Sequence, residues 1–124
     1  MGRKKGTEPL MRRFLLALAL LGGSSDALRV RTTFYHAAPG SLSACGKALP
    51  GSFRQIAVSR DLRRAYPCGT RVRVTLHERK GGVKTFVAVV QDVMGPHARH
   101  SIDIKVNRHA LRYGRTTATI VRLH

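Results

Sequence analysis

The chain has 124 residues, with 23 Lys and Arg against 6 Asp and Glu, and two Cys. This length allows one domain and excludes a large multidomain enzyme. The net charge of +17 favours an anionic partner, although high Arg content is also typical of a GC-rich genome. The basic residues are spread through every segment, without a like-charge run or an aromatic-rich recognition motif, so nucleic acid is not the expected partner.

Residues 1–27 have the layout of a secretory signal peptide. Five basic residues precede the apolar core Phe14–Leu21, and small side chains follow up to Ala27. The core is too short to span a bilayer, and no Cys stands at the cleavage point to carry a lipid. Translation could start at Met11 instead of Met1. We expect a secreted or periplasmic protein cleaved near Ala27, which meets the membrane only through its leader. A short membrane anchor or an amphipathic N-terminus is the alternative.

Residues 28–124 form the expected mature domain. They hold 18 Lys and Arg against four Asp and Glu, a formal surplus of 14 positive charges. Such a domain has a small core that a covalent cross-link would support. Cys45 and Cys68 are most simply a disulfide in an exported protein, and a catalytic or metal-binding role is the weaker alternative. The expected partner is an anionic envelope polymer such as peptidoglycan, teichoic acid or lipopolysaccharide, and the expected state is a monomer.

The first half of the mature domain predicts strands separated by a long loop. Residues 28–35 are rich in β-formers, and 55–59 read as a short buried strand followed by at most one helical turn at 61–65. The intervening loop at 37–52 contains three Gly-containing turns. Residues 70–77 alternate strictly, and 79–82 predict a hairpin turn into the apolar strand 83–91.

Asp92 follows that strand in a loop containing Gly95 and Pro96. Beyond it we expect a strand at 101–104, a helix over 106–113 capped by Asn107 and stopped by Gly114, and a strand at 116–123. Six short strands with one or two short helices indicate an all-β fold, a small barrel.

The order of these segments resembles the double-psi β-barrel of the rare lipoprotein A family, whose relatives include expansins, barwin-like proteins and 3D domains. The resemblance covers nearly all of the mature chain and rests on five stretches: Thr33–Tyr35, Ser43–Gly46, Ile56–Ser59 with Cys68–Val74, Val89–Pro96 and Ile102–Gly114. It implies a six-stranded double-psi β-barrel.

The resemblance implies lytic transglycosylase activity on peptidoglycan, with Asp92 as the acid/base and no cofactor. Asp103 matches an Asp that is structural in this fold. Lys47 and Ser59 stand where the family has Glu and His, so activity would rest on Asp92 alone. The alternatives are a non-catalytic glycan binder like an expansin and, third, a barwin-type inhibitor or defence protein.

The remaining candidate residues are expected to surround Asp92. Tyr35, His36, Ser59, His97 and His100 are candidates for binding substrate, with Tyr35 stacking on a sugar or packing at the edge of the core. The spacing of His97 and His100 also permits a metal site with Asp92, but solvated histidines are the simpler interpretation. Asp92 itself has a second interpretation, as a carboxylate that pairs with Arg or accepts hydrogen bonds from loop amides.

Overall fold

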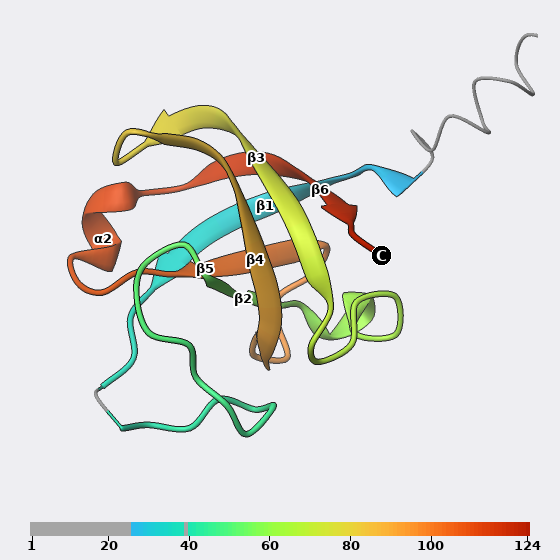
Figure 1. Cartoon of the computed structure of the whole chain (residues 1–124). Coiled ribbons are helices and arrows are strands. Elements are labelled where there is room, and N and C mark those ends of the chain that lie inside the picture. The colour runs from blue at the N-terminus through green and yellow to red at the C-terminus, as the bar shows by residue number, and fades with distance from the viewer. Residues whose placement is uncertain (1–25, 39) are drawn as a thin grey trace, which may run out of the picture.

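The computed structural model describes residues 26–38 and 40–124, so the expected leader lies outside the described residues except for Asp26 and Ala27. The described chain folds into six strands, a 3-10 turn at Arg60–Leu62 and one short helix, α2 (Ala110–Tyr113) (Figure 1). The strands are β1 (Leu28–Tyr35), β2 (Gln55–Val58), β3 (Arg71–Lys80), β4 (Val83–Val93), β5 (Ser101–Lys105) and β6 (Thr116–Arg122). No helix within these residues is long and apolar enough to cross a bilayer.

The strands close into one barrel in the order β1-β5-β2-β4-β3-β6. β1 pairs with β5 in parallel and β2 pairs with β4 in parallel, whereas the other four pairings are antiparallel. Parallel neighbours cannot be joined by tight hairpins, so the chain crosses over the barrel to make each of these pairs. The expected mostly-β fold, a closed six-stranded barrel, is confirmed.

Alternating side chains fill the interior of the barrel. On β3, Val72, Val74 and Leu76 are fully buried while Arg71 and Arg73 are exposed, as the strict alternation of that stretch predicts. Ile102 and Ile104 of β5 are likewise fully buried on either side of Asp103. The inward residues of the strands therefore form the core, and β2 is the exception in that all four of its residues are buried.

The helix predicted over 106–113 is wrong in its first half. Val106 is buried, and its N–H donates to the Tyr35 carbonyl at 2.8 Å. It therefore continues the pairing of β5 with β1 by one residue and is not helical. The N-cap is His109 in the left-handed region at φ 59°, not Asn107, and the helix begins only at Ala110. Gly114 ends it as expected, with its N–H donating to the Leu111 carbonyl.

Strand β3 is longer than predicted at the hairpin, and β4 is longer than predicted at its C-terminal end. β3 and β4 continue to Lys80 and from Val83, which leaves only Gly81 and Gly82 in the turn. At the other end β4 runs to Val93, so Asp92 lies within a strand and not in the loop that follows it. The side chain of a residue inside a paired strand points to one defined face of the sheet, so the pairing of β4 sets the direction of the Asp92 carboxyl group.

Candidate functional site

Asp92 and Asp103 lie on either side of the same residue, Ala57 of β2. Ala57 is the register partner of Asp92 on parallel β4 and of Asp103 on antiparallel β5. Asp103 is in turn the partner of Thr33 on β1, so four strands contribute to one row. Side chains in register share a face of a sheet, and this row faces outward because Ile102 and Ile104 point into the core. Two carboxyl groups therefore flank the methyl side chain of Ala57, which is itself only 4% exposed, on the outer side of the barrel wall.

A β-bulge in β4 determines that Asp92 faces outward. Ile56 pairs with Val90 but Ala57 pairs with Asp92, so Gln91 is the extra residue. Without this insertion Gln91 would occupy the row and Asp92 would point to the other face, because side chains alternate along a strand. The carbonyl of Gln91 instead accepts a hydrogen bond from Cys45 N at 3.2 Å, which brings the 36–54 loop against β4.

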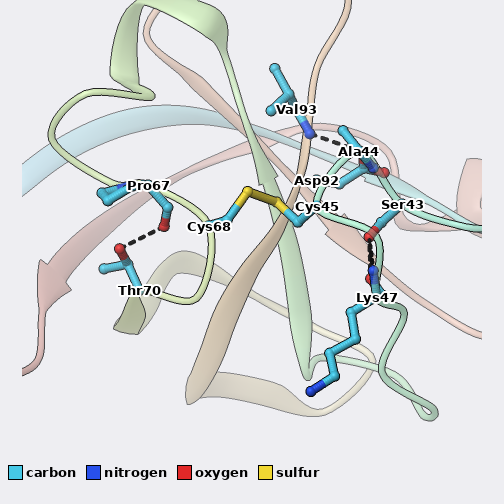
Figure 2. The surroundings of a disulfide bond; sticks show 9 residues. All are labelled: Ser43, Ala44, Cys45, Lys47, Pro67, Cys68, Thr70, Asp92 and Val93. Carbon is cyan, nitrogen blue, oxygen red and sulfur yellow. Dashed lines mark hydrogen bonds between the residues drawn. A yellow bond between two sulfur atoms is a disulfide. The ribbon is translucent and has the colours of Figure 1, made fainter.

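Asp92 is held by two backbone amides. Its Oδ1 accepts hydrogen bonds from Ala44 N and from Val93 N, each at 2.9 Å (Figure 2). Within the described part of the chain the one ion pair joins Lys80 and Glu78, so Asp92 is not paired with an Arg there. The amide contacts are those of the second interpretation of Asp92, and they fix the orientation of its carboxyl group.

Asp103 is a partly buried carboxyl group with an altered pKa. Burial raises the pKa of Asp103 above its ordinary value, the hydrogen bond from Thr33 Oγ1 at 2.9 Å lowers it, and the charge of Asp92 raises it. Asp103 therefore holds its proton to a higher pH than an exposed Asp does.

Tyr35, at the end of β1, lies in the same electrostatic environment. Burial is the largest cause that raises the pKa of Tyr35 to about 12; the Gln55 hydrogen bond opposes it, and the charges of Asp92 and Asp103 add to it. Its Oη accepts a hydrogen bond from Gln55 Nε2 at 2.7 Å. The phenol therefore stays protonated through the physiological range, beside two carboxyl groups.

Two polar residues that the sequence did not single out hold the 36–54 loop beside this site. Gln55 is buried, and its Oε1 accepts a hydrogen bond from Leu49 N at 2.9 Å while its amide donates to Tyr35. Lys105 Nζ donates to the Leu49 carbonyl at 3.0 Å. A signal was present for Gln55, which is the one polar residue in the buried strand Gln55–Val58. The contact of Lys105 with Leu49 depends on how the strands pair, and no local sequence pattern indicates it.

The predicted disulfide is confirmed. Cys45 and Cys68 are bonded with their Cα atoms 5.8 Å apart. Figure 2 shows the bond joining the loop that carries Ala44 to the turn that carries Pro67, next to Asp92. The Lys47 side chain extends away from Asp92 in the same view. The disulfide thus anchors the loop whose Ala44 amide binds the Asp92 carboxyl group.

The other predicted site residues lie in different surroundings. Ser59 is fully buried, and its Oγ accepts a hydrogen bond from Ser101 N at 3.0 Å, which gives it a structural contact and no exposed surface for a substrate. His36 is exposed just beyond Tyr35. His97 lines a cavity of about 480 Å³ together with Thr33, the residue that donates to Asp103.

His100 is exposed, and its backbone N–H donates to both carboxylate oxygens of Asp61, at 3.2 and 3.0 Å. The pKa of Asp61 is lowered, chiefly by a hydrogen bond from Ser59, and also by the His100 amide and by Arg99. The charge-bearing loop after Gly95 is thus tied to Asp61. Over residues 26–38 and 40–124, no three His, Cys, Asp or Glu side chains form a group that could hold a metal ion.

Solved structures with this arrangement include an expansin. The expansin of Clavibacter michiganensis superposes with a TM-score of 0.59 at 22% identity, over 79% of this chain and 50% of the expansin. The fold is a double-psi β-barrel. The same expansin, as a point variant, has also been solved in complex with cellohexaose, and matches with the same TM-score.

Two further solved structures with this fold are a lytic transglycosylase and a protease inhibitor. The lytic transglycosylase MltA of Escherichia coli matches with a TM-score of 0.51 at 20% identity, over 71% of this chain and 28% of MltA. A Streptomyces papain inhibitor matches with a TM-score of 0.56 at 20% identity, over 79% of this chain and 94% of the inhibitor. No protein-family model and no curated sequence matches the chain. The chain spans about half the length of the expansin.

The titration of Tyr35 tests the description of the site. The pKa of about 12 in the folded protein exceeds the value of about 10 in an unfolded chain, so the Tyr35 contribution to stability is intact below pH 10 and is lost as the pH rises through 12. Ultraviolet absorbance of the phenolate should show a late step that is missing in Tyr35→Phe. Asp103→Asn should shift that step to lower pH, and an unchanged step would contradict the coupling.

Removal of the disulfide should loosen the Ala44 contact with Asp92. In Cys45→Ser/Cys68→Ser, the free energy of unfolding should fall by roughly 3 kcal/mol because a loop closed by about 23 residues is released. Hydrogen exchange of the Ala44 amide should become faster, whereas the Val93 amide, which is next to Asp92 in the chain, serves as the control. Equal protection of Ala44 in both proteins would show that the disulfide does not hold this contact.

Proposed function

We propose that the protein is exported and cleaves peptidoglycan glycan strands as a lytic transglycosylase, with Asp92 as the acid/base. The observation that carries this proposal is the Asp92–Asp103 pair on the outer face of the barrel. Within the described residues the protein's hydrogen bonds to Asp92 all go to Oδ1, which leaves Oδ2 to face a bound sugar. Asp103 and Tyr35, both with raised pKa values, lie in the same electrostatic environment.

The reaction needs one carboxyl group used twice. Asp92 in its acid form protonates the glycosidic oxygen, and the bond from that oxygen to the anomeric carbon of the muramic acid breaks. The resulting carboxylate then removes the proton from the muramic 6-hydroxyl, which bonds to the anomeric carbon and closes an anhydro ring. Asp92 ends in its starting acid form. The reaction therefore consumes no water and needs no second catalytic carboxylate.

Asp103 has a positioning role in this proposal. Its carboxyl group lies across Ala57 from Asp92, and two carboxyl groups that interact do not both ionise freely. Asp103, whose pKa is raised, therefore takes up a proton more easily than an isolated exposed Asp does. This offsets the absence of the Glu and His that Lys47 and Ser59 replace in the resemblance.

Export is supported by three features of the chain. The Cys45–Cys68 disulfide is typical of an oxidising compartment. Residues 1–27 have signal-peptide composition, and the surplus of 14 positive charges in 28–124 suits an anionic wall. MltA, which shares the barrel, is named as a lytic transglycosylase, in agreement with the proposed reaction.

A non-catalytic glycan binder is the second candidate. Two amide hydrogen bonds on Oδ1 are also what a purely structural Asp92 would make, and an expansin with this barrel has been solved with cellohexaose. In this case the cationic surface and Tyr35 would hold the wall polymer, and no bond would be cleaved.

Digestion of purified peptidoglycan separates the two functions. The wild-type protein and Glu78→Gln, which alters an exposed carboxylate away from the site, should release muropeptides with anhydro ends, read by mass spectrometry. Asp92→Asn should release them more slowly by roughly two to four orders of magnitude, the usual contribution of a general acid. Circular dichroism should show that each variant is folded.

The opposite outcome is equally informative. If neither wild type nor Asp92→Asn releases anhydro products, while both sediment with the same sacculi, the protein is a binder and Asp92 has no catalytic role.

A further inference from the structure

A cationic cavity lies by the hairpin that precedes β4, whereas Asp92 lies near the other end of that strand. A cavity of about 500 Å³ opens between the β3–β4 hairpin and the segment around α2, which lie side by side in Figure 1. Four of its lining side chains are cationic, and two chain segments contribute them: Arg79, Lys80, Arg108 and Arg112. The fold therefore gathers these charges, which are not a run in the sequence.

The walls of this cavity are fixed by packing. The Tyr113 ring stacks on Phe34 at a centroid distance of 4.9 Å, which anchors it to the core. Gly81 lies so close to Tyr113 that a Cβ there would come within 3.0 Å of the ring, at φ 55°. The Asn107 N–H donates to Ser52 Oγ at 2.8 Å. A site shaped before binding loses little conformational freedom when a ligand arrives.

The charges in this cavity are poorly balanced. In the part of the chain that the structure describes, the one ion pair joins Lys80 Nζ to Glu78 Oε1 at 3.5 Å, and the Glu78 side chain is 64% exposed. Arg79 donates one guanidinium N–H to the Gly82 carbonyl at 3.0 Å. Arg108 and Arg112 have no carboxylate partner among the described residues. Gathered cations repel one another, and a bound anion relieves that repulsion.

We propose that this cavity binds phosphate groups carried on an envelope polymer. Three of the four cations are Arg, whose planar guanidinium matches phosphate oxygens with two parallel hydrogen bonds, and a phosphate offers enough acceptors for several such groups at once. The cavity shares no lining residue with the Asp92 site, because Asp92, Asp103 and Tyr35 are not among the residues that line it. It would thus hold the protein on a phosphate-bearing wall without occupying the Asp92 site, and it does not depend on the reaction proposed there.

The test uses long-chain polyphosphate as the probe, with binding measured by calorimetry at physiological salt. Arg108→Gln/Arg112→Gln should bind polyphosphate roughly tenfold more weakly than wild type, because two charge-assisted contacts are lost. The matched control is Arg63→Gln/Arg64→Gln, which removes the same charge from exposed positions outside the cavity and should change affinity by less than about twofold. Circular dichroism should confirm that both variants are folded.

Four outcomes would overturn the proposal. These are no binding of polyphosphate by wild type, equal losses in the two double variants, binding of the carboxylate polymer polygalacturonate as tight as that of polyphosphate, and tighter binding of duplex DNA through Arg108 and Arg112. If none occurs, competition by poly(glycerol phosphate) or by lipopolysaccharide identifies the phosphate source, and either result supports the site.

Discussion

The insertion of β2 between β4 and β5 is the constraint on which the candidate site depends. Because β2 pairs with one neighbour in parallel and the other antiparallel, Ala57 has Asp92 on one side and Asp103 on the other. The bulge at Gln91 sets the direction of Asp92, and the disulfide brings the Ala44 amide to it. Backbone pairing, and not the sequence distance between the two acids, places their carboxyl groups together.

This arrangement has an energetic cost that the barrel must offset. Burial and the charge of Asp92 both disfavour ionised Asp103, so at neutral pH the ionised Asp103 opposes folding. A fully buried set of aliphatic residues from all six strands and one covalent cross-link act in the other direction. Retaining interacting carboxyl groups on a small domain is typical of a functional site, where stability is exchanged for chemistry.

The strands could be predicted because their signals are local, and the disulfide could be predicted because the sequence contains two Cys. The alternation of Val72, Val74 and Leu76 and the two glycines of the hairpin depend only on neighbouring residues. The helix over 106–113 was predicted too long because buried Val106 falls at helical spacing although it belongs to the end of a strand.

The composition of the site could be predicted only in part. Asp92, Asp103 and Tyr35 could be selected from the family resemblance, and they lie in one electrostatic environment. The roles of Thr33, Gln55 and Lys105 follow from barrel closure, which no local pattern encodes. Ser59 was expected to face a ligand, yet it is fully buried against Ser101. The cationic cavity beside α2 likewise needs the β3–β4 hairpin to fold over Tyr113.

The coupling of the two carboxyl groups is tested most directly by a carbon-13 NMR titration of the Asp side chains. The structure predicts that Asp103 titrates above the ordinary pKa of an Asp, and that Asp92→Asn moves its pKa downward because a neighbouring negative charge is removed. Glu78→Gln should leave the Asp103 titration unchanged. If Asp103 titrates identically in wild type and Asp92→Asn, the two groups do not interact, and the carboxyl pair is not the basis of the site.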